Sequence, residues 1–358
     1  MNRRDFVRTM AVSGAVMATA APALARAATL LNGAGQPVRI PLGMDNFAVR
    51  AMGLKGRPLV DFAAGLNLDT LFITDLPGLG SLETTAAGEL RKYAADKGLQ
   101  ILLGSWSICP TSVRFKKDWG TAEEHLALGL KLSKAVGSPI FRIVLGGRED
   151  RSTPGGIEAR IADTLKVLQS QRSLARDLGV QVAVENHAGD MTARELAGLI
   201  EAAGRDWVGA NLDSGNALWT LEDPTASLEI LGPYTISTSL RDSAIWATDK
   251  GAKVQWTAFG EGGVVNWKAY FERYAQLCPK VAVNIETIGG FAIEFPYLQA
   301  DFWKAFPQKP ALELAQFEAL VRRGRPVALH DSNDPNGQRG ELERSVRYLR
   351  EVIGLGTR

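Results

Sequence analysis

The chain has 358 residues, of which 46% are hydrophobic and 22% are charged, an ordinary composition for a globular protein with a large core. Its 41 Lys and Arg residues nearly balance its 39 Asp and Glu residues, which argues against a nucleic-acid-binding protein or one held on anionic membranes. The length would permit two domains, but a single α/β barrel commonly needs about 250 residues or more.

The first 26 residues are interpreted as a twin-arginine signal peptide rather than as part of the fold. Residues 2–8 read NRRDFVR, an apolar run covers residues 10–22, and residues 23–25 form an A-x-A cleavage site. The apolar run is short and rich in small residues, which makes it too weak for a stable membrane span. We therefore expect the mature protein, residues 27–358, in the periplasm after export by the Tat machinery.

Beyond the signal, short runs of Val, Ile and Leu alternate with helical patterns. Eight such runs are predicted as strands buried on both faces, at residues 38–44, 70–74, 100–105, 140–145, 180–185, 208–213, 235–240 and 281–286. Helical patterns lie between several of them, at residues 86–97, 122–136, 157–178 and 267–277. This alternation predicts a single (β/α)8 TIM barrel rather than an open doubly wound sheet. No Gly-x-Gly-x-x-Gly motif opens the first unit, which argues against a dinucleotide-binding fold.

Three of the predicted strands end in a carboxylate: Glu185 at strand five, Asp213 at strand six and Glu286 at strand eight. Between the first two, Thr192 and Glu195 form a predicted capping box at the start of a helix. Because the carboxyl ends of parallel strands meet at the mouth of a barrel, the three acids should converge and repel one another unless a proton or a cation sits among them. Hard oxygen ligands favour Mn²⁺ or Mg²⁺. The alternative is that each acid caps a neighbouring helix.

Four further residues near strand ends are candidates for substrate binding. His187 could bind a metal, donate to a substrate oxygen or hydrogen-bond within the barrel wall. Arg142 and Arg241 could anchor substrate hydroxyls or a carboxylate, or could simply balance the charge of the acids. Trp106 could stack on a sugar face or belong to the core.

With these residues the chain resembles the sugar phosphate isomerase/epimerase family, with its xylose-isomerase-like TIM barrel, as an exported member with a twin-arginine signal. The resemblance rests on five short motifs: ENH at residues 185–187 with Thr192, DSGN at 213–216, RD at 241–242, GEG at 260–262 with Trp267, and IE at 285–286. It covers most of the mature chain.

The resemblance implies one divalent metal held by Glu, Asp, His and Glu from strands five to eight. Glu185, Asp213 and Glu286 match the acidic ligands, whereas Ser239 stands where the strand-seven pattern His-x-Lys-Asp has its histidine. Mn²⁺ or Mg²⁺ is the expected ion, with Zn²⁺ as another option. The resemblance also implies that Glu185 and Glu286 exchange a proton with substrate carbon through an enediolate.

Three functions stay open at this point. The first is a sugar isomerase or epimerase acting on a sugar or a related polyhydroxy carbonyl compound. The second is a lyase or hydratase acting on a keto-sugar or glycoside with the same site. The third is a barrel that binds carbohydrate without catalysis, with Ser239 as the trace of a lost site.

After strand eight, residues 289–310 read GGFAIEFPYLQADFWKAFPQKP, an aromatic stretch too long for a simple connection. It opens a C-terminal extension, residues 289–358, and is predicted to be a lid over the barrel mouth or a contact in a homo-oligomer. A final helix is expected at residues 340–353. Cys109 and Cys278 should lie at opposite barrel faces, so no disulfide is expected.

Overall fold

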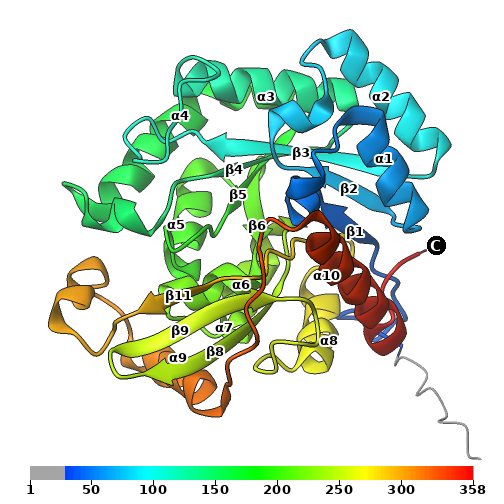
Figure 1. Ribbon diagram of the computed structural model, residues 1–358. Coiled ribbons are helices and arrows are strands. Elements are labelled where there is room, and N and C mark those ends of the chain that lie inside the picture. Colours follow the sequence, from blue (N-terminus) through cyan, green and yellow to red (C-terminus); the bar gives the residue numbers. More distant parts are fainter. Residues whose placement is uncertain (1–28, 358) are drawn as a thin grey trace, which may run out of the picture.

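A computed structural model describes residues 29–357 of the protein and confirms the (β/α)8 barrel (Figure 1). The export signal assigned to residues 1–26 lies outside the described residues and stays a prediction. Eight parallel strands form the barrel in the order β10-β1-β2-β3-β4-β5-β6-β7. They are β1 (Leu42–Asp45), β2 (Thr70–Ile73), β3 (Gln100–Ser107), β4 (Ile140–Val144), β5 (Gln181–Glu185), β6 (Val208–Leu212), β7 (Thr235–Thr238) and β10 (Val283–Ile285).

The barrel closes between β7 and β10 through a single isolated bridge, Leu240 with Ile285. Two backbone hydrogen bonds make this bridge, from the Leu240 amide to the Asn284 carbonyl (2.8 Å) and from the Glu286 amide to the Leu240 carbonyl (2.9 Å). The two segments run parallel, so the residues that follow the bridge on each of them lie side by side. These residues are Arg241 and Glu286, at the barrel mouth.

Helices lie around the barrel and beside its mouth (Figure 1). They are α1 (Gly56–Gly65), α2 (Thr84–Asp96), α3 (Ala122–Val136), α4 (Gly156–Leu178), α5 (Ala193–Ala203), α6 (Ser214–Ala217), α7 (Pro224–Leu231), α8 (Trp267–Leu277), α9 (Ala311–Arg323) and α10 (Pro335–Tyr348). The predicted capping box of α5 is present, since the Thr192 hydroxyl accepts from the Glu195 amide and the Glu195 carboxylate accepts from the Thr192 amide. The predicted final helix begins earlier than expected, with α10, and runs on into a π-helical turn at Leu349–Ile353.

The interior of the barrel is layered. Ile140 on β4 and Ala183 on β5 belong to an apolar layer at the amino-terminal side of the strands, together with residues of β2 and β3. Side chains of a strand alternate between its two faces, so Arg142 and Glu185, two residues further along, point into the same interior nearer the mouth. The polar cluster of the site therefore lies above an apolar layer of the interior.

The sequence prediction lacked a second, antiparallel sheet beside the barrel mouth. The strands β8 (Asp242–Thr248) and β9 (Gly251–Thr257) form a hairpin inserted between barrel strands β7 and β10, and β11 (Ala292–Phe295) pairs with β9. A separate hydrophobic core lies under this sheet, where Ile245 and Val254 pack with Phe317 of α9. The first part of the stretch at 289–310 is therefore a strand.

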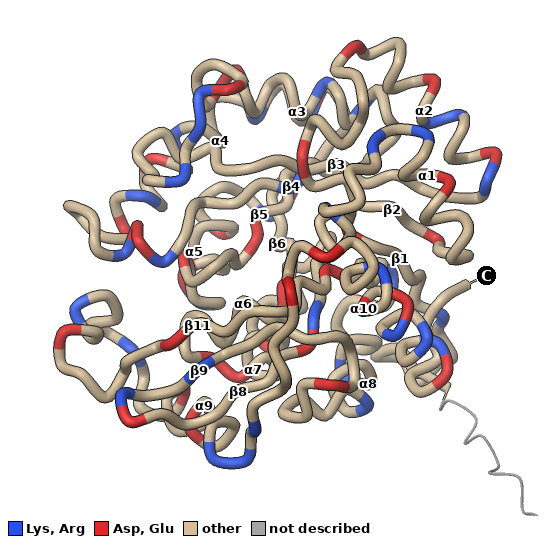
Figure 2. Tube along the Cα trace, viewed as in Figure 1, with Lys and Arg blue, Asp and Glu red and all other residues tan. Residues whose placement is uncertain are grey.

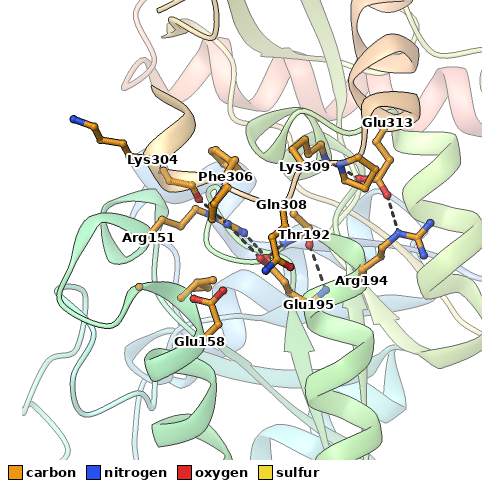
Figure 3. A pocket seen from close by; sticks show the side chains of 15 residues that line it. Arg151, Glu158, Thr192, Arg194, Glu195, Lys304, Phe306, Gln308, Lys309 and Glu313 are labelled. Carbon is orange, nitrogen blue, oxygen red and sulfur yellow. Dashed lines mark hydrogen bonds and ion pairs between the residues drawn. The ribbon is translucent and has the colours of Figure 1, made fainter. Parts of the chain in front are cut away.

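The end of that stretch is anchored to the barrel by Arg151 (Figure 3). The Arg151 guanidinium pairs with Glu195, donates to the Ala305 carbonyl (3.2 Å) and lies 4.3 Å from the centroid of the Phe306 ring. Lys309 pairs with Glu313 at 2.9 Å. Whether residues 289–310 act as a lid or as an oligomer contact stays a prediction.

Charged residues of both signs are interspersed along the outer helices (Figure 2). No helix of the described residues is long and apolar enough to cross a membrane. Cys109 and Cys278 are both buried and free.

Candidate metal and active site

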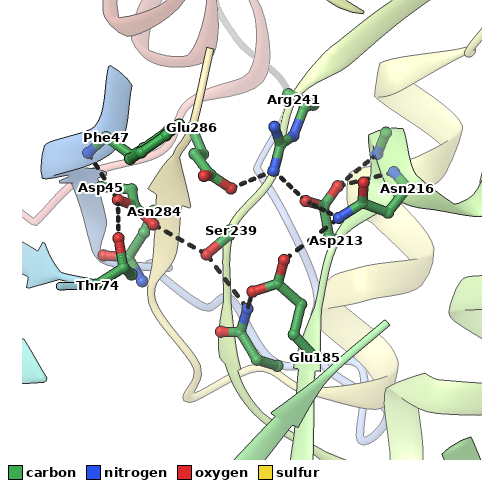
Figure 4. Close-up of polar contacts among 12 residues, drawn as sticks. Asp45, Phe47, Thr74, Glu185, Asp213, Asn216, Ser239, Arg241, Asn284 and Glu286 are labelled. Atoms are coloured by element: carbon green, nitrogen blue, oxygen red, sulfur yellow. Dashed lines mark hydrogen bonds and ion pairs between the residues drawn. The ribbon is translucent and has the colours of Figure 1, made fainter. Parts of the chain in front are cut away.

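The structure brings the three predicted carboxylates together at the barrel mouth (Figure 4). Glu185 is the last residue of β5, Asp213 follows β6, and Glu286 follows β10. One oxygen of each lies within 4.8 Å of an oxygen of the other two. All three side chains are buried. Such a cluster is stable only if donors, protons or a cation offset the repulsion.

Glu185 is surrounded by hydrogen-bond donors. Its Oε2 accepts from Arg142 Nε (2.6 Å) and Asn211 Nδ2 (2.8 Å), and its Oε1 accepts from Asn216 Nδ2 (3.2 Å). Burial alone would raise the pKa of Glu185, but the charges of Arg142 and other nearby cations outweigh burial and hold this pKa below its ordinary value. Glu185 is therefore a carboxylate at neutral pH.

Asp213 does two jobs, since it also caps α6. Its Oδ1 accepts from the amides of Gly215 (2.7 Å) and Asn216 (3.0 Å), while Oδ2 accepts from Asn216 Nδ2 (2.7 Å) and from Arg241. Burial raises the pKa of Asp213 to about 6, against the opposing charge of Arg241. Asp213 therefore caps a helix with Oδ1, as one interpretation of the sequence expected, and turns Oδ2 towards the acid cluster.

Arg241 lies between two of the acids. Its Nη2 donates to Asp213 and to Glu286, and its guanidinium carbon is 4.3 Å from the centroid of the Trp256 ring. Its Nε and Nη1 are buried and have no hydrogen-bond partner within residues 29–357. Burial raises the pKa of Glu286 well above its ordinary value, and the charge of Arg241 opposes the rise.

Ser239 adjoins the cluster through a fourth buried acid that the sequence analysis missed. Its hydroxyl donates to Asp45 Oδ2 (3.2 Å) and accepts from Asn211 Nδ2 (3.2 Å). Asp45 Oδ1 accepts from the Thr74 hydroxyl (2.6 Å), and burial raises the pKa of Asp45 to about 6. The predicted first strand ended one residue before Asp45, so the rule that singled out the other acids would have found it.

A cavity of about 260 Å³ opens above the cluster. All four residues predicted to bind substrate line it: Trp106, Arg142, His187 and Arg241. Glu286 is the acid of the cluster that contributes to its wall, and further aromatic walls come from Phe47, Trp256 and Phe291. Aromatic faces beside convergent polar groups suit a sugar, whose C–H faces are apolar and whose hydroxyls need partners.

His187 is neutral in this wall. Burial lowers its pKa to about 4 despite the nearby charge of Glu185. Its Nδ1 lies 2.7 Å from the Gly146 carbonyl oxygen, which can only accept, so Nδ1 carries the proton and Nε2 is an acceptor. Its ring meets Trp106 edge-on, with centroids 6.0 Å apart.

The donor set fits a hard divalent cation. Three buried carboxylates offer oxygen ligands within a few ångströms of one another. His187 is not part of this set of carboxylates. The hydroxyl of Ser239, the fourth ligand position expected from the sequence, is hydrogen-bonded to Asp45 and Asn211.

Comparisons with known proteins agree with this architecture. The family described as "Xylose isomerase-like TIM barrel" matches residues 60–289. No curated protein matches the sequence significantly.

Among solved structures, a xylose isomerase domain protein from Planctomyces limnophilus is 18% identical, with a TM-score of 0.53 over 79% of this chain and 97% of that one. The D-psicose 3-epimerase from Clostridium cellulolyticum H10, solved with D-tagatose, is 12% identical, with a TM-score of 0.55 over 88% and 99%. The IolI protein, solved with a bound zinc atom, is 14% identical, with a TM-score of 0.56 over 80% and 100%. At these identities the likeness concerns the fold.

Proposed function

The chain belongs to the xylose isomerase-like TIM barrel family, and on this premise we propose that it is a metal-dependent isomerase or epimerase of a sugar or related polyhydroxy carbonyl compound. One observation carries the proposal. Three buried carboxylates, Glu185, Asp213 and Glu286, lie close enough together to hold one divalent ion, and Glu286 also lines the aromatic cavity. The pKa of Glu185 is held below its ordinary value and that of Glu286 is raised, as in pairs of acids that serve as base and acid in proton transfer.

Glu185, Asp213 and Glu286 would hold the ion, and Mn²⁺ or Mg²⁺ suits these hard ligands better than Zn²⁺. When bound, a divalent cation would polarise the substrate carbonyl and acidify the adjacent C–H bond.

The protein residues supply the proton transfers and the substrate contacts. Glu185 removes the proton beside the carbonyl, and Glu286, which lines the cavity, delivers a proton to the resulting enediolate. The free N–H groups of Arg241 face the charge that develops on oxygen.

The remaining wall residues orient the sugar. Nε2 of His187 accepts from a substrate hydroxyl, because its Nδ1 is bound to Gly146. Trp106 and Trp256 cover the apolar face of the sugar and keep water from the intermediate.

A lyase acting on a glycoside is the second candidate, favoured by a neighbouring hollow of about 530 Å³ that Trp219, Phe295 and Phe302 line. Trp219 stacks on Trp256 of the sugar cavity, with ring centroids 4.7 Å apart. An apolar aglycone would fit this hollow. In that reaction Glu286 would protonate the leaving oxygen after Glu185 has removed the α-proton.

We further propose that the protein acts in the periplasm after Tat export, an inference that rests on the residue pattern at 2–25. Free sugars or glycosides are then the expected substrates.

Exchange of carbon-bound hydrogen tests the proposal. The protein is loaded with Mn²⁺ and incubated in D₂O with ketoses, hexoses and keto-sugar glycosides, and uptake of deuterium is followed by mass spectrometry. We expect Glu185→Gln and Glu286→Gln to slow exchange by roughly 10²- to 10⁴-fold. Glu89→Gln on the exposed face of α2 is the matched control and should match wild type. Saturable sugar binding without exchange in any substrate would favour the non-catalytic carbohydrate-binding barrel instead.

A further inference from the structure

The acid cluster already contains a cation of its own. Arg241 donates through Nη2 to Asp213 and to Glu286, so it occupies acceptor oxygens on two of the three carboxylates that would hold a metal. Its side chain is 2% exposed. A metal ion and this guanidinium therefore compete for the same oxygens.

The guanidinium is incompletely bound in this position. Nε and Nη1 of Arg241 are buried without a hydrogen-bond partner among the described residues. By contrast, Arg142 uses Nε on Glu185 and Nη1 on the Ser105 carbonyl. A buried donor without a partner is unfavourable, so a position in which Nε and Nη1 find partners would offset part of the loss of the two ion pairs of Arg241.

The space for such a movement is next to it. Arg241 and Trp256 both line the cavity of about 260 Å³ above the cluster. The guanidinium carbon lies 4.3 Å from the centroid of the Trp256 ring. A change in the position of Arg241 therefore changes the surroundings of this indole.

We propose that Arg241 is a built-in competitor for the metal, which binds Glu185, Asp213 and Glu286 only by displacing the guanidinium into the cavity that it lines. This inference rests on the proposed function, because it concerns the same metal site. The protein then has two states: one with Arg241 among the acids, and one with a divalent ion there and the arginine N–H groups turned to the substrate space. Metal affinity is lowered by the free energy of moving the guanidinium.

Metal titration without substrate tests this. The full chain is stripped with EDTA and titrated with Mn²⁺ by calorimetry, as wild type, Arg241→Met and Arg142→Met. Arg241→Met should bind at least about tenfold more tightly than wild type, because it removes the charge that occupies the site. Arg142→Met removes an equal charge from the same cluster and frees an oxygen of Glu185, but it leaves Arg241 on the oxygens of Asp213 and Glu286, and should gain less affinity than Arg241→Met. Arg241→Gln, also neutral, serves if circular dichroism shows that the methionine variant is unfolded.

Intrinsic fluorescence supplies a second measurement. Titration of wild type with diamagnetic Mg²⁺ should change the tryptophan emission as Arg241 leaves Trp256, and this change should be absent in Trp256→Phe and in Arg241→Met.

The titration distinguishes a failure of the proposed competition from a failure of the proposed function. Equal Mn²⁺ affinities for wild type and Arg241→Met, or an equal gain in Arg142→Met, would overturn the competition and leave the metal site standing. No Mn²⁺ binding by any variant would overturn both the competition and the metal-dependent function.

Discussion

The two buried arginines of the site differ in how they are held. Arg142 comes from within a barrel strand, β4, and binds both the Glu185 carboxylate and the Ser105 carbonyl. Arg241 lies past the end of β7, just before the hairpin strand β8, and is bound through a single nitrogen. The site therefore has one arginine fixed by strand pairing and another, beyond the ladders, to which we assign the proposed movement.

The physical reason lies in the backbone. Arg142 sits in a ladder where five consecutive residues of β4 pair with β5, which leaves its main chain little freedom. Arg241 follows the isolated bridge at Leu240 and has no ladder partner in the barrel; its main chain is held instead by the Ser214 hydroxyl, which accepts from its amide and donates to its carbonyl. A fixed arginine, such as Arg142, suits the support of the proposed base Glu185. An arginine outside the ladders, such as Arg241, suits the proposed exchange with a metal ion.

Removing each arginine in turn tests this difference most strongly. Arg142→Met leaves Glu185 as a buried carboxylate without its ion-pair partner and should lower the free energy of unfolding by about 3–5 kcal/mol. Arg241→Met should lower it by less than Arg142→Met, because Asp213 keeps its Asn216 donors. Urea denaturation in EDTA measures both. Equal losses would show that the two arginines are held alike.

The pH dependence of stability tests the surroundings of Arg142, whose partner Ser105 also contacts His125. His125 on α3 lies 2.7 Å from the Ser105 hydroxyl, and burial lowers its pKa from 6.5 to about 4. The unfolded chain therefore binds more protons than the folded one between these values, so stability falls as the pH drops from 6.5 towards 4. His125 should account for up to about 3 kcal/mol of this loss.

His125→Gln should flatten that part of the curve relative to wild type, as measured by urea denaturation at several pH values. A parallel curve in the variant would mean that His125 titrates normally and that water reaches it.

An effect of opposite sign is expected at Glu286. Burial raises its pKa well above the ordinary value, so the folded chain disfavours the charged form, and the neutral side chain of Glu286→Gln should raise the free energy of unfolding at pH 7 in EDTA. Stability of wild type should decline as the pH rises through the pKa of Glu286, whereas the variant should not show this decline. A large loss at pH 7 would indicate that Glu286 is ionised and bound tightly to Arg241.

The barrel itself was predictable because its signals are local. Each strand is a short apolar run buried on both faces, and the acids at the ends of strands five, six and eight follow from the strand boundaries alone. The capping box at Thr192 was predictable for the same reason, because its partner Glu195 is only three residues away. Strand ends shifted by one to a few residues, as with 38–44 against Leu42–Asp45.

What could not be predicted depends on neighbours distant in sequence. The sequence analysis assigned Arg241 to substrate or to charge balance, and only the closing of the barrel against Ile285 brings it onto Glu286. The hairpin β8–β9 was missed although its turn, at Asp249 and Lys250 before Gly251, is a recognisable signal between two alternating segments.

The single bridge at Leu240 has a consequence for how the molecule opens. Seven strand pairs of the barrel are joined by ladders, whereas the eighth contact depends on two backbone hydrogen bonds and on the side chains of Thr238 and Asn284. Local opening at this seam would part Arg241 from Glu286 without disturbing any ladder. Glu286 and Arg241 thus lie on either side of the one contact between neighbouring barrel strands, within the described residues, that is an isolated bridge and not a ladder.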